Sequence, residues 1–87
     1  MAVKPIQISG HAWFEMKRRG ISRTQVVQMI RAPGQVVPSV KGREIYQGLI
    51  GRAGRLLLRV VVAADARAIH VVTAYKTSKI GKYWRTP

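Results

Sequence analysis

The fold of this chain is decided by three consecutive segments, EIYQGLI (residues 44–50), GRAG (51–54) and RLLLRVVVAA (55–64). The two outer segments are rich in β-branched and aliphatic residues, which is typical of strands. The segment between them has glycine at both ends, and glycine readily adopts the positive φ values that hairpin turns need. The three segments therefore predict two antiparallel strands joined by a tight turn.

The strand pattern continues on both sides of this hairpin. Residues 35–40 and 68–76 also read as strands, and they are joined to the hairpin by turns at 41–42 and 65–67. Residues 6–8 are a candidate for a short edge strand, since Pro5 is tolerated at its start. The sequence thus predicts a meander of four antiparallel strands.

Helical periodicity precedes the meander. Ser9 is a candidate N-cap for a helix over about 10–19, and Gly20 is a matching stop. Ser22 and Gln25 have the spacing of a capping box and open a second helix over about 22–32. We therefore expect an α+β fold in which two N-terminal helices pack on a four-stranded antiparallel sheet. Residues 1–87 form one domain, with a basic tail from about residue 77.

The charge of the chain is strongly unbalanced, with 16 Lys+Arg against 3 Asp+Glu and a net charge of +13. Such an excess attracts polyanions and opposes folding by self-repulsion. The hydrophobic content of 47% is ordinary for a globular domain, so the charge overlies a real core. We therefore expect a polyanionic partner, RNA in the first place, with DNA left open.

Other classes of protein are disfavoured by composition. The chain has no cysteine and only two histidines, which disfavours disulfides and a zinc site. The longest apolar run, residues 60–64, is far shorter than the roughly 20 residues of a membrane span. The N-terminus lacks the apolar stretch of a signal peptide. We expect a soluble, cytoplasmic protein without a cofactor, a metal or a membrane contact.

The third strand of the meander predicts where the partner would bind. Leu56, Leu58, Val60 and Val62 share one face, whereas Arg55 and Arg59 share the other. Because arginines without partners are costly in a core, we expect the helices to cover the apolar face and leave the basic face open. The alternative is an ordinary solvated face, with the arginine stems lying over their neighbours.

RNA cleavage by its own 2′-OH needs a base, a cation for the phosphate and an acid for the leaving group. Our candidates for these catalytic roles are His11, Arg19, Tyr75 and Lys76. His11 lies four residues before Glu15, which could orient its ring and raise its pKa. Candidate nucleic-acid contacts are Lys17, Arg18, Tyr46, Arg52, Arg55, Arg59, Thr73, Lys79 and Lys82. The competing interpretations are helix capping for His11, core packing for Tyr75 and simple phosphate attraction for the lysines.

Four further residues have mainly structural interpretations. Trp13 and Phe14 flank the apolar side of the first helix, and we expect one of them in the core and the other over the edge of the sheet. His70 lies between apolar residues and reads as a structural or sheet-surface histidine. Trp84 is unusual in a polar tail, so it either docks back on the domain or contacts a partner.

Several motifs also carry a family resemblance. They are His11-Ala12 with Met16, Arg19-Gly20-Ile21-Ser22 and Val26; Gly42-Arg43 with Tyr46-Gln47-Gly48; Gly54-Arg55-Leu56 with Val60-Val61-Val62; and Val71-Val72-Thr73-Ala74-Tyr75. Over residues 8–77 the chain resembles a family of small bacterial domains of unknown function that is placed near the RelE/ParE-type and BrnT-type toxins. Members of this family often have a basic residue before the methionine, where this chain has Glu15.

The resemblance implies a RelE-like fold with two helices on a curved antiparallel sheet. It further implies a concave face that binds RNA and cleaves it without a metal. His11, Arg19 and Thr73 match the family pattern most directly, followed by Tyr46 and Arg55. On this basis we expect a metal-independent endoribonuclease toxin of a toxin–antitoxin system, with an acidic antitoxin as partner. The alternatives are a non-catalytic nucleic-acid-binding module and a basic protein-interaction domain.

Overall fold

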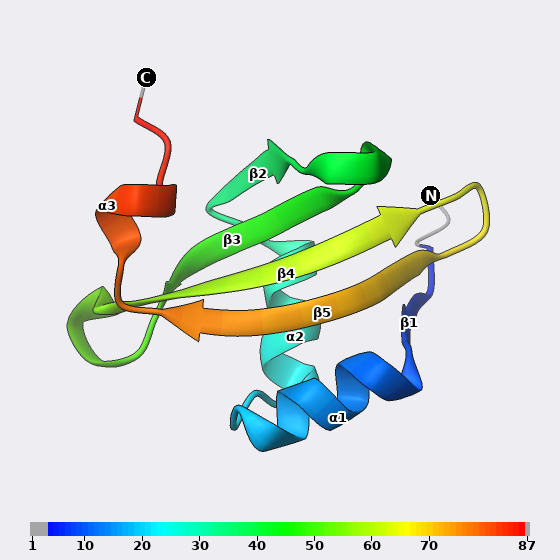
Figure 1. Ribbon diagram of the computed structural model, residues 1–87, viewed down its shortest axis with the longest axis horizontal. Coiled ribbons are helices and arrows are strands. Elements are labelled where there is room, and N and C mark those ends of the chain that lie inside the picture. The colour runs from blue at the N-terminus through cyan, green and yellow to red at the C-terminus, as the bar shows by residue number, and fades with distance from the viewer. Residues whose placement is uncertain (1–3, 87) are drawn as a thin grey trace.

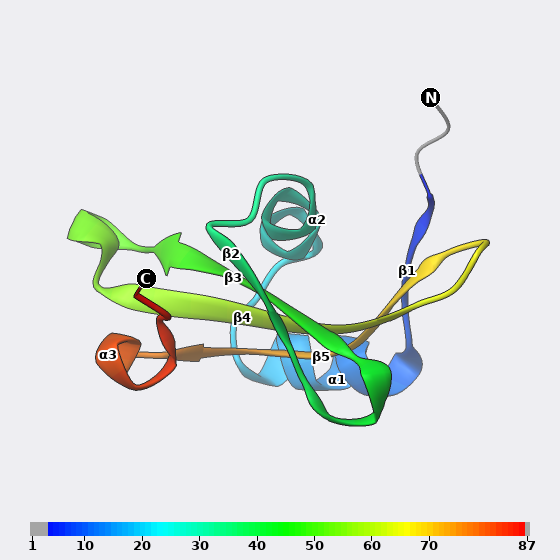
Figure 2. The same ribbon diagram turned by 90° about the horizontal axis from the view of Figure 1, so that it is seen from above.

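The computed structural model describes residues 4–86, which form a five-stranded sheet and three helices (Figure 1). The elements in chain order are β1 (Ile6–Ile8), α1 (Gly10–Arg18), α2 (Arg23–Arg31), β2 (Gln35–Pro38), β3 (Glu44–Ile50), β4 (Leu56–Ala64), β5 (Ile69–Thr77) and α3 (Ile80–Tyr83), with 3₁₀ turns η1 (Val40–Gly42) and η2 (Arg52–Gly54). Figure 2 shows α2 on one side of the sheet, with α3 and the C-terminal end on the other.

The predicted four-stranded antiparallel sheet with two helices is wrong in two respects. The antiparallel meander exists as β2-β3-β4-β5, but β1 adds a fifth strand in the order β1-β5-β4-β3-β2. β1 runs parallel to β5, with Ile6 opposite Ile69, so the sheet is mixed. In addition, the tail contains the third helix, α3. The candidate edge strand at residues 6–8 is present as β1, but its pairing with β5 was not predicted. Parallel pairing across a long crossover leaves no local signal in the sequence.

Local sequence explains where α1 and α2 begin. The Ser9 hydroxyl accepts a hydrogen bond of 3.0 Å from the Ala12 amide. Ser22 and Gln25 form the predicted capping box, with reciprocal bonds of 3.1 and 3.0 Å. Gly20 follows α1 at a φ of +67°, a value that favours glycine over residues with a Cβ. These caps satisfy amides that the first helical turns would otherwise leave unpaired.

The main core lies between the sheet and helices α1 and α2. Its buried residues are Ala12, Met16, Ile21, Val26, Met29, Ile30, Leu58, Val60, Val62, Val71 and Ala74. The expectation that Trp13 or Phe14 belongs to the core is wrong, because their exposed fractions are 42% and 65%. Ala12 and Met16 form the buried side of α1 that faces the sheet, and Phe14 points away from it.

Among residues 4–86, no helix is long and apolar enough to cross a membrane.

Candidate nucleic-acid-binding site

Arg59 lies on the sheet face opposite α1 and α2, but it is only 7% exposed. Its Nε donates a hydrogen bond of 2.8 Å to Gln47 Oε1, and its Nη1 donates to the Tyr75 hydroxyl. Its guanidinium carbon also lies 4.1 Å from the centroid of the Tyr83 ring. The expectation of an open basic face is therefore wrong at Arg59, because its neighbours and the C-terminal segment bury this cation. The guanidinium group of Arg59 therefore contacts the Gln47 amide, the Tyr75 hydroxyl and the Tyr83 ring in place of water.

The C-terminal segment is attached through a chain of amide hydrogen bonds. Gln47 Nε2 donates to Gln35 Oε1 at 2.9 Å and to the Tyr83 carbonyl at 3.1 Å. Gln35 in turn exchanges hydrogen bonds with both backbone groups of Arg85. The indole of Trp84 covers Gly34, where an added Cβ would lie 2.9 Å from Trp84 Cη2. Trp84 thus docks back on the domain, which was one of the two roles considered for it.

Glu15 binds two arginines instead of the predicted histidine. Its Oε2 lies 2.6 Å from Arg18 Nη2 and 3.1 Å from Arg19 Nη2. The hydrogen bond from Arg18 lowers the pKa of Glu15 below its ordinary value, and the positive charge of Arg19 acts in the same direction. Within residues 4–86, His11 forms no ion pair with Glu15.

Arg19 joins the end of α1 to β5. Its Nη1 donates to the Ala74 carbonyl at 2.9 Å and to the Thr73 hydroxyl at 3.3 Å. β1 pairs with β5 only at residues 69–71, so this carbonyl lies beyond the part of the β5 edge that β1 covers. Lys76 Nζ lies 3.5 Å from the Gly20 carbonyl, close to the same end of the helix. The structure thus brings together three predicted site residues, which are Arg19, Thr73 and Lys76.

The other two catalytic candidates lie elsewhere. His11 occupies the first turn of α1, and eight residues of helix separate it from Arg19 by about 12 Å along the axis. Tyr75 lies two residues after Thr73 on β5, and its side chain points to the sheet face opposite that of Lys76. On that face, the Tyr75 hydroxyl accepts a hydrogen bond from Arg59. The four predicted catalytic residues therefore occupy three separate places in this structure.

The remaining predicted contact residues are scattered over the surface. Lys17 and Arg18 are exposed on α1, and Arg52 and Arg55 are exposed at the turn between β3 and β4. Lys79 and Lys82 are exposed at the tail, and Lys82 Nζ lies 5.3 Å from the centroid of the Tyr83 ring. Tyr46 is half-buried and packs against the main core. Of this set, Lys17 and Arg18 lie beside exposed aromatic rings.

The exposed side of α1 combines aromatic and basic side chains. We call it the α1 face and define it as His11, Trp13, Phe14, Lys17 and Arg18, all of which are exposed. Trp13 precedes Lys17 by four residues, and Phe14 precedes Arg18 by four, so each ring neighbours a cation on the helix surface. The sequence prediction omitted the two rings because their apolar character suggested burial. The i, i+4 spacing from Lys17 and Arg18 could have identified them.

The two remaining polar residues of note belong to the turn between β4 and β5. Asp65 Oδ1 accepts hydrogen bonds of 2.8 Å from the amides of Arg67 and Ala68. These bonds, together with His70, lower the pKa of Asp65 to about 2. His70 Nε2 lies 3.1 Å from Asp65 Oδ2. These contacts support the structural role expected of His70.

The fold and these contacts belong to a small basic α+β domain. The chain is a member of the family described as a domain of unknown function, DUF4258, whose model matches residues 8–76. No curated protein and no solved structure gives a match. The family assignment thus agrees with the resemblance to domains of unknown function, and the relation to RelE/ParE-type and BrnT-type toxins stays a prediction.

Proposed function

We propose that this domain binds single-stranded RNA through the α1 face. The observation that carries the proposal is the pair of exposed rings, Trp13 at 42% and Phe14 at 65%, beside Lys17 and Arg18. An aromatic ring accepts a stacked base of any sequence, and each stack contributes about 1–3 kcal/mol. The neighbouring cations attract the phosphates that link the bases.

The charge of the whole chain supports the same proposal. The net charge is +13, and Glu15 and Asp65 are two of only three acidic residues. Glu15 is neutralised by Arg18 and Arg19, while Asp65 is held in its own turn. Among residues 4–86, Arg18 and Arg19 are the only Lys or Arg side chains with a carboxylate within 4.0 Å. The basic excess therefore does not serve internal ion pairs.

Metal-independent RNA cleavage is the second candidate function. It is favoured by Arg19, which bonds the Thr73 hydroxyl and the Ala74 carbonyl, and by Lys76, whose Nζ lies 3.5 Å from the carbonyl of the neighbouring Gly20. Two cations at this end of α1 could contact one phosphate. Cleavage also needs a proton acceptor, and His11 lies at the other end of α1. We therefore place binding first and cleavage by the Arg19–Lys76 end of α1 second.

Fluorescence anisotropy with a labelled oligouridylate of about twelve nucleotides tests the first candidate. We expect Trp13→Ala and Phe14→Ala each to weaken binding by about 5- to 150-fold, the loss of one stacked base. The matched control is Leu49→Ala, because Leu49 is a 50% exposed apolar side chain on β3, outside the α1 face. An equal loss in this control, or no binding by the wild type at low salt, would refute the proposal.

The same RNA tests cleavage when it is incubated with the protein in EDTA and analysed on a denaturing gel. Cleavage that is lost in Lys76→Ala, while anisotropy shows intact binding, would support the second candidate. His11→Ala reports separately on the distant histidine. Intact RNA after long incubation with well-folded wild type would leave binding as the function.

A further inference from the structure

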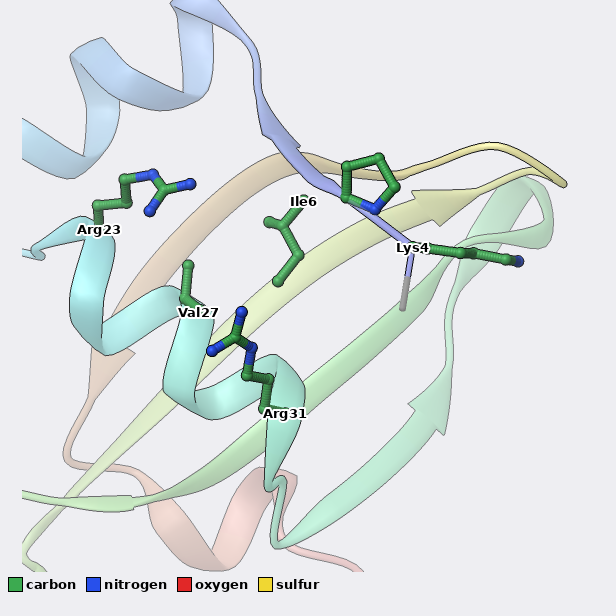
Figure 3. A pocket seen from close by; sticks show the side chains of 6 residues that line it. Lys4, Ile6, Arg23, Val27 and Arg31 are labelled. Atoms are coloured by element: carbon green, nitrogen blue, oxygen red, sulfur yellow. The ribbon is translucent and has the colours of Figure 1, made fainter. Parts of the chain in front are cut away.

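A groove runs between β1 and α2, on residues that the α1 face does not include (Figure 3). Its lining residues are Lys4, Pro5, Ile6, Arg23, Val27 and Arg31, around a volume of about 310 Å³. An adjoining hollow of about 410 Å³ shares Lys4, Ile6 and Arg31 and adds Ile30 and Ile69. We call these two hollows together the β1–α2 groove. Its floor is aliphatic, and no aromatic side chain of residues 4–86 lines it.

Two cations border this aliphatic floor. Arg23, Val27 and Arg31 follow one another at four-residue spacing and therefore share one side of α2. Figure 3 shows the guanidinium groups of Arg23 and Arg31 on either side of Val27, with Ile6 of β1 opposite. Neither arginine forms an ion pair with another residue of the described part of the chain. Lys4 differs, because its Nζ donates to the Asp65 carbonyl at 2.8 Å and the side chain extends away from α2.

The spacing of the two arginines matches an extended peptide. Eight residues of helix separate Arg23 from Arg31 by about 12 Å along the axis of α2. In an extended chain, residues i and i+4 lie about 13 Å apart and point to the same side. Residue i+2 also points to that side, midway between them. It would therefore face Val27 and Ile6 when residues i and i+4 face the arginines.

We propose that the β1–α2 groove binds an extended peptide segment of a partner protein, with acidic residues at i and i+4 and an aliphatic residue at i+2. Charge complementarity selects the acidic residues, and the floor selects the aliphatic one. Single-stranded RNA fits this surface less well, because a base finds no aromatic ring to stack on. The groove thus has the chemistry of a protein-recognition site, separate from the proposed RNA-binding face.

A fluorescein-labelled peptide of about nine residues, with Glu at i and i+4 and Ile at i+2 in a Ser/Thr background, is the probe. Its matched control has the same composition but carries the second Glu at i+3, which points to the other side of the strand. A second control replaces Ile by Ser. We expect the probe to bind the full chain more tightly than either control. Equal binding of the two isomers would overturn the proposal, since attraction by net charge alone gives that result.

Variants of the protein locate the site. We expect Arg23→Gln combined with Arg31→Gln to lower the affinity for the peptide probe by roughly 3- to 10-fold, which corresponds to the loss of two exposed ion pairs. Arg52→Gln combined with Arg55→Gln removes the same charge from the turn between β3 and β4 and should leave binding near wild type. Circular dichroism confirms that both double variants are folded. Equal losses in the two would overturn the proposal.

Competition with unlabelled oligouridylate separates this inference from the proposed function. If the groove recognises peptide, Trp13→Ala should weaken the binding of RNA and leave the binding of the peptide probe unchanged. The combined Arg23→Gln and Arg31→Gln variant should instead weaken the binding of the probe more than the binding of RNA. Displacement of the probe by RNA in the Trp13→Ala variant would instead make the groove a nucleic-acid site and overturn the proposal. Failure of RNA binding in all variants refutes the proposed function alone.

Discussion

The guanidinium carbon of Arg59 lies 4.1 Å from the centroid of the Tyr83 ring, so a cation of the central strand β4 is covered by the short helix α3. Tyr75 also contacts Arg59, and the two tyrosine rings meet edge to face at a centroid distance of 6.5 Å. No carboxylate among residues 4–86 lies within 4.0 Å of Arg59. Its charge is therefore stabilised by an amide oxygen, a phenol and ring faces. The C-terminal segment is part of the folded domain.

Tyr83→Ala should lower the free energy of unfolding by about 1–3 kcal/mol, because it removes the ring over Arg59 and the packing of that ring. Tyr83→Phe should stay within about 0.5 kcal/mol of wild type, because the contact uses the ring and Gln47 binds the backbone carbonyl. Urea denaturation followed by circular dichroism measures both. If Tyr83→Phe lowered the free energy of unfolding as much as Tyr83→Ala does, the hydroxyl, and not the ring, would be what stabilises the C-terminal segment.

Gln47→Leu should be more damaging than Gln35→Leu. Gln47 Oε1 accepts from the buried Nε of Arg59, whereas Gln35 bonds Gln47 and the exposed Arg85. Leucine at position 47 leaves a buried charged donor unpaired, and we expect a loss of about 2–4 kcal/mol against about 1 kcal/mol at position 35. The measurement is again the free energy of unfolding in urea. Similar losses at the two positions would contradict a special role for the Arg59–Gln47 bond.

Gly34→Ala should release Trp84 from the domain. A Cβ at position 34 would lie 2.9 Å from Trp84 Cη2 and 3.3 Å from the Gln47 carbonyl, so the indole must move. In a Trp13→Phe background, Trp84 is the remaining tryptophan, and its fluorescence should become more accessible to acrylamide. Gly10→Ala is the matched control, since an added Cβ there meets no atom of the described residues within 4 Å beyond its chain neighbours and its own helix backbone. Unchanged quenching in Gly34→Ala would mean that the tail adapts without undocking.

The features that the sequence predicted well are local. Ser9, the Ser22–Gln25 box and the glycines at 51 and 54 act within a few residues of their own position, and the structure has them where they were expected. Alternation along β4 likewise placed Arg59 on the opposite face from Val60. Such short-range rules depend on backbone sterics and nearby hydrogen bonds, which the sequence states directly.

What sequence reasoning missed depends on contacts between distant segments. Gln35 meets Arg85 across 50 positions, and periodicity contains no information on such a contact. The tail helix α3 has four residues, too few to show a pattern of its own. The burial of Arg59 depends on this docking, so the expected basic face is not open at Arg59, whereas Arg55 stays exposed. Trp13 and Phe14 were misplaced because hydrophobicity alone does not distinguish a core residue from an exposed ring.

Glu15→Gln should strengthen RNA binding while it weakens the fold. Glu15 neutralises Arg18 on the α1 face and Arg19 behind it, so its removal leaves both cations to attract phosphate. We expect higher affinity in anisotropy at about 50 mM salt and a steeper dependence of affinity on salt. Glu44→Gln changes the net charge equally on β3, outside the α1 face, and should have the smaller effect. An equal gain in both would indicate that RNA senses only the total charge.

Asp65→Asn should cost stability at neutral pH and cost nothing in strong acid. The amides of Arg67 and Ala68, and then His70, lower the pKa of Asp65 from 3.8 to about 2. Because folding lowers this pKa, the ionised carboxylate stabilises the folded state fully above pH 3.8, and the stabilisation disappears as the pH falls through about 2.

Urea unfolding measures the free energy of unfolding of wild type and Asp65→Asn across this pH range. The two free energies should converge as the pH falls from 3.8 to about 2. Glu44→Gln serves as the control, since Glu44 forms no ion pair among residues 4–86. A difference between wild type and Asp65→Asn that stays constant down to pH 2 would place the effect of Asp65 in the geometry of the turn, independent of its charge.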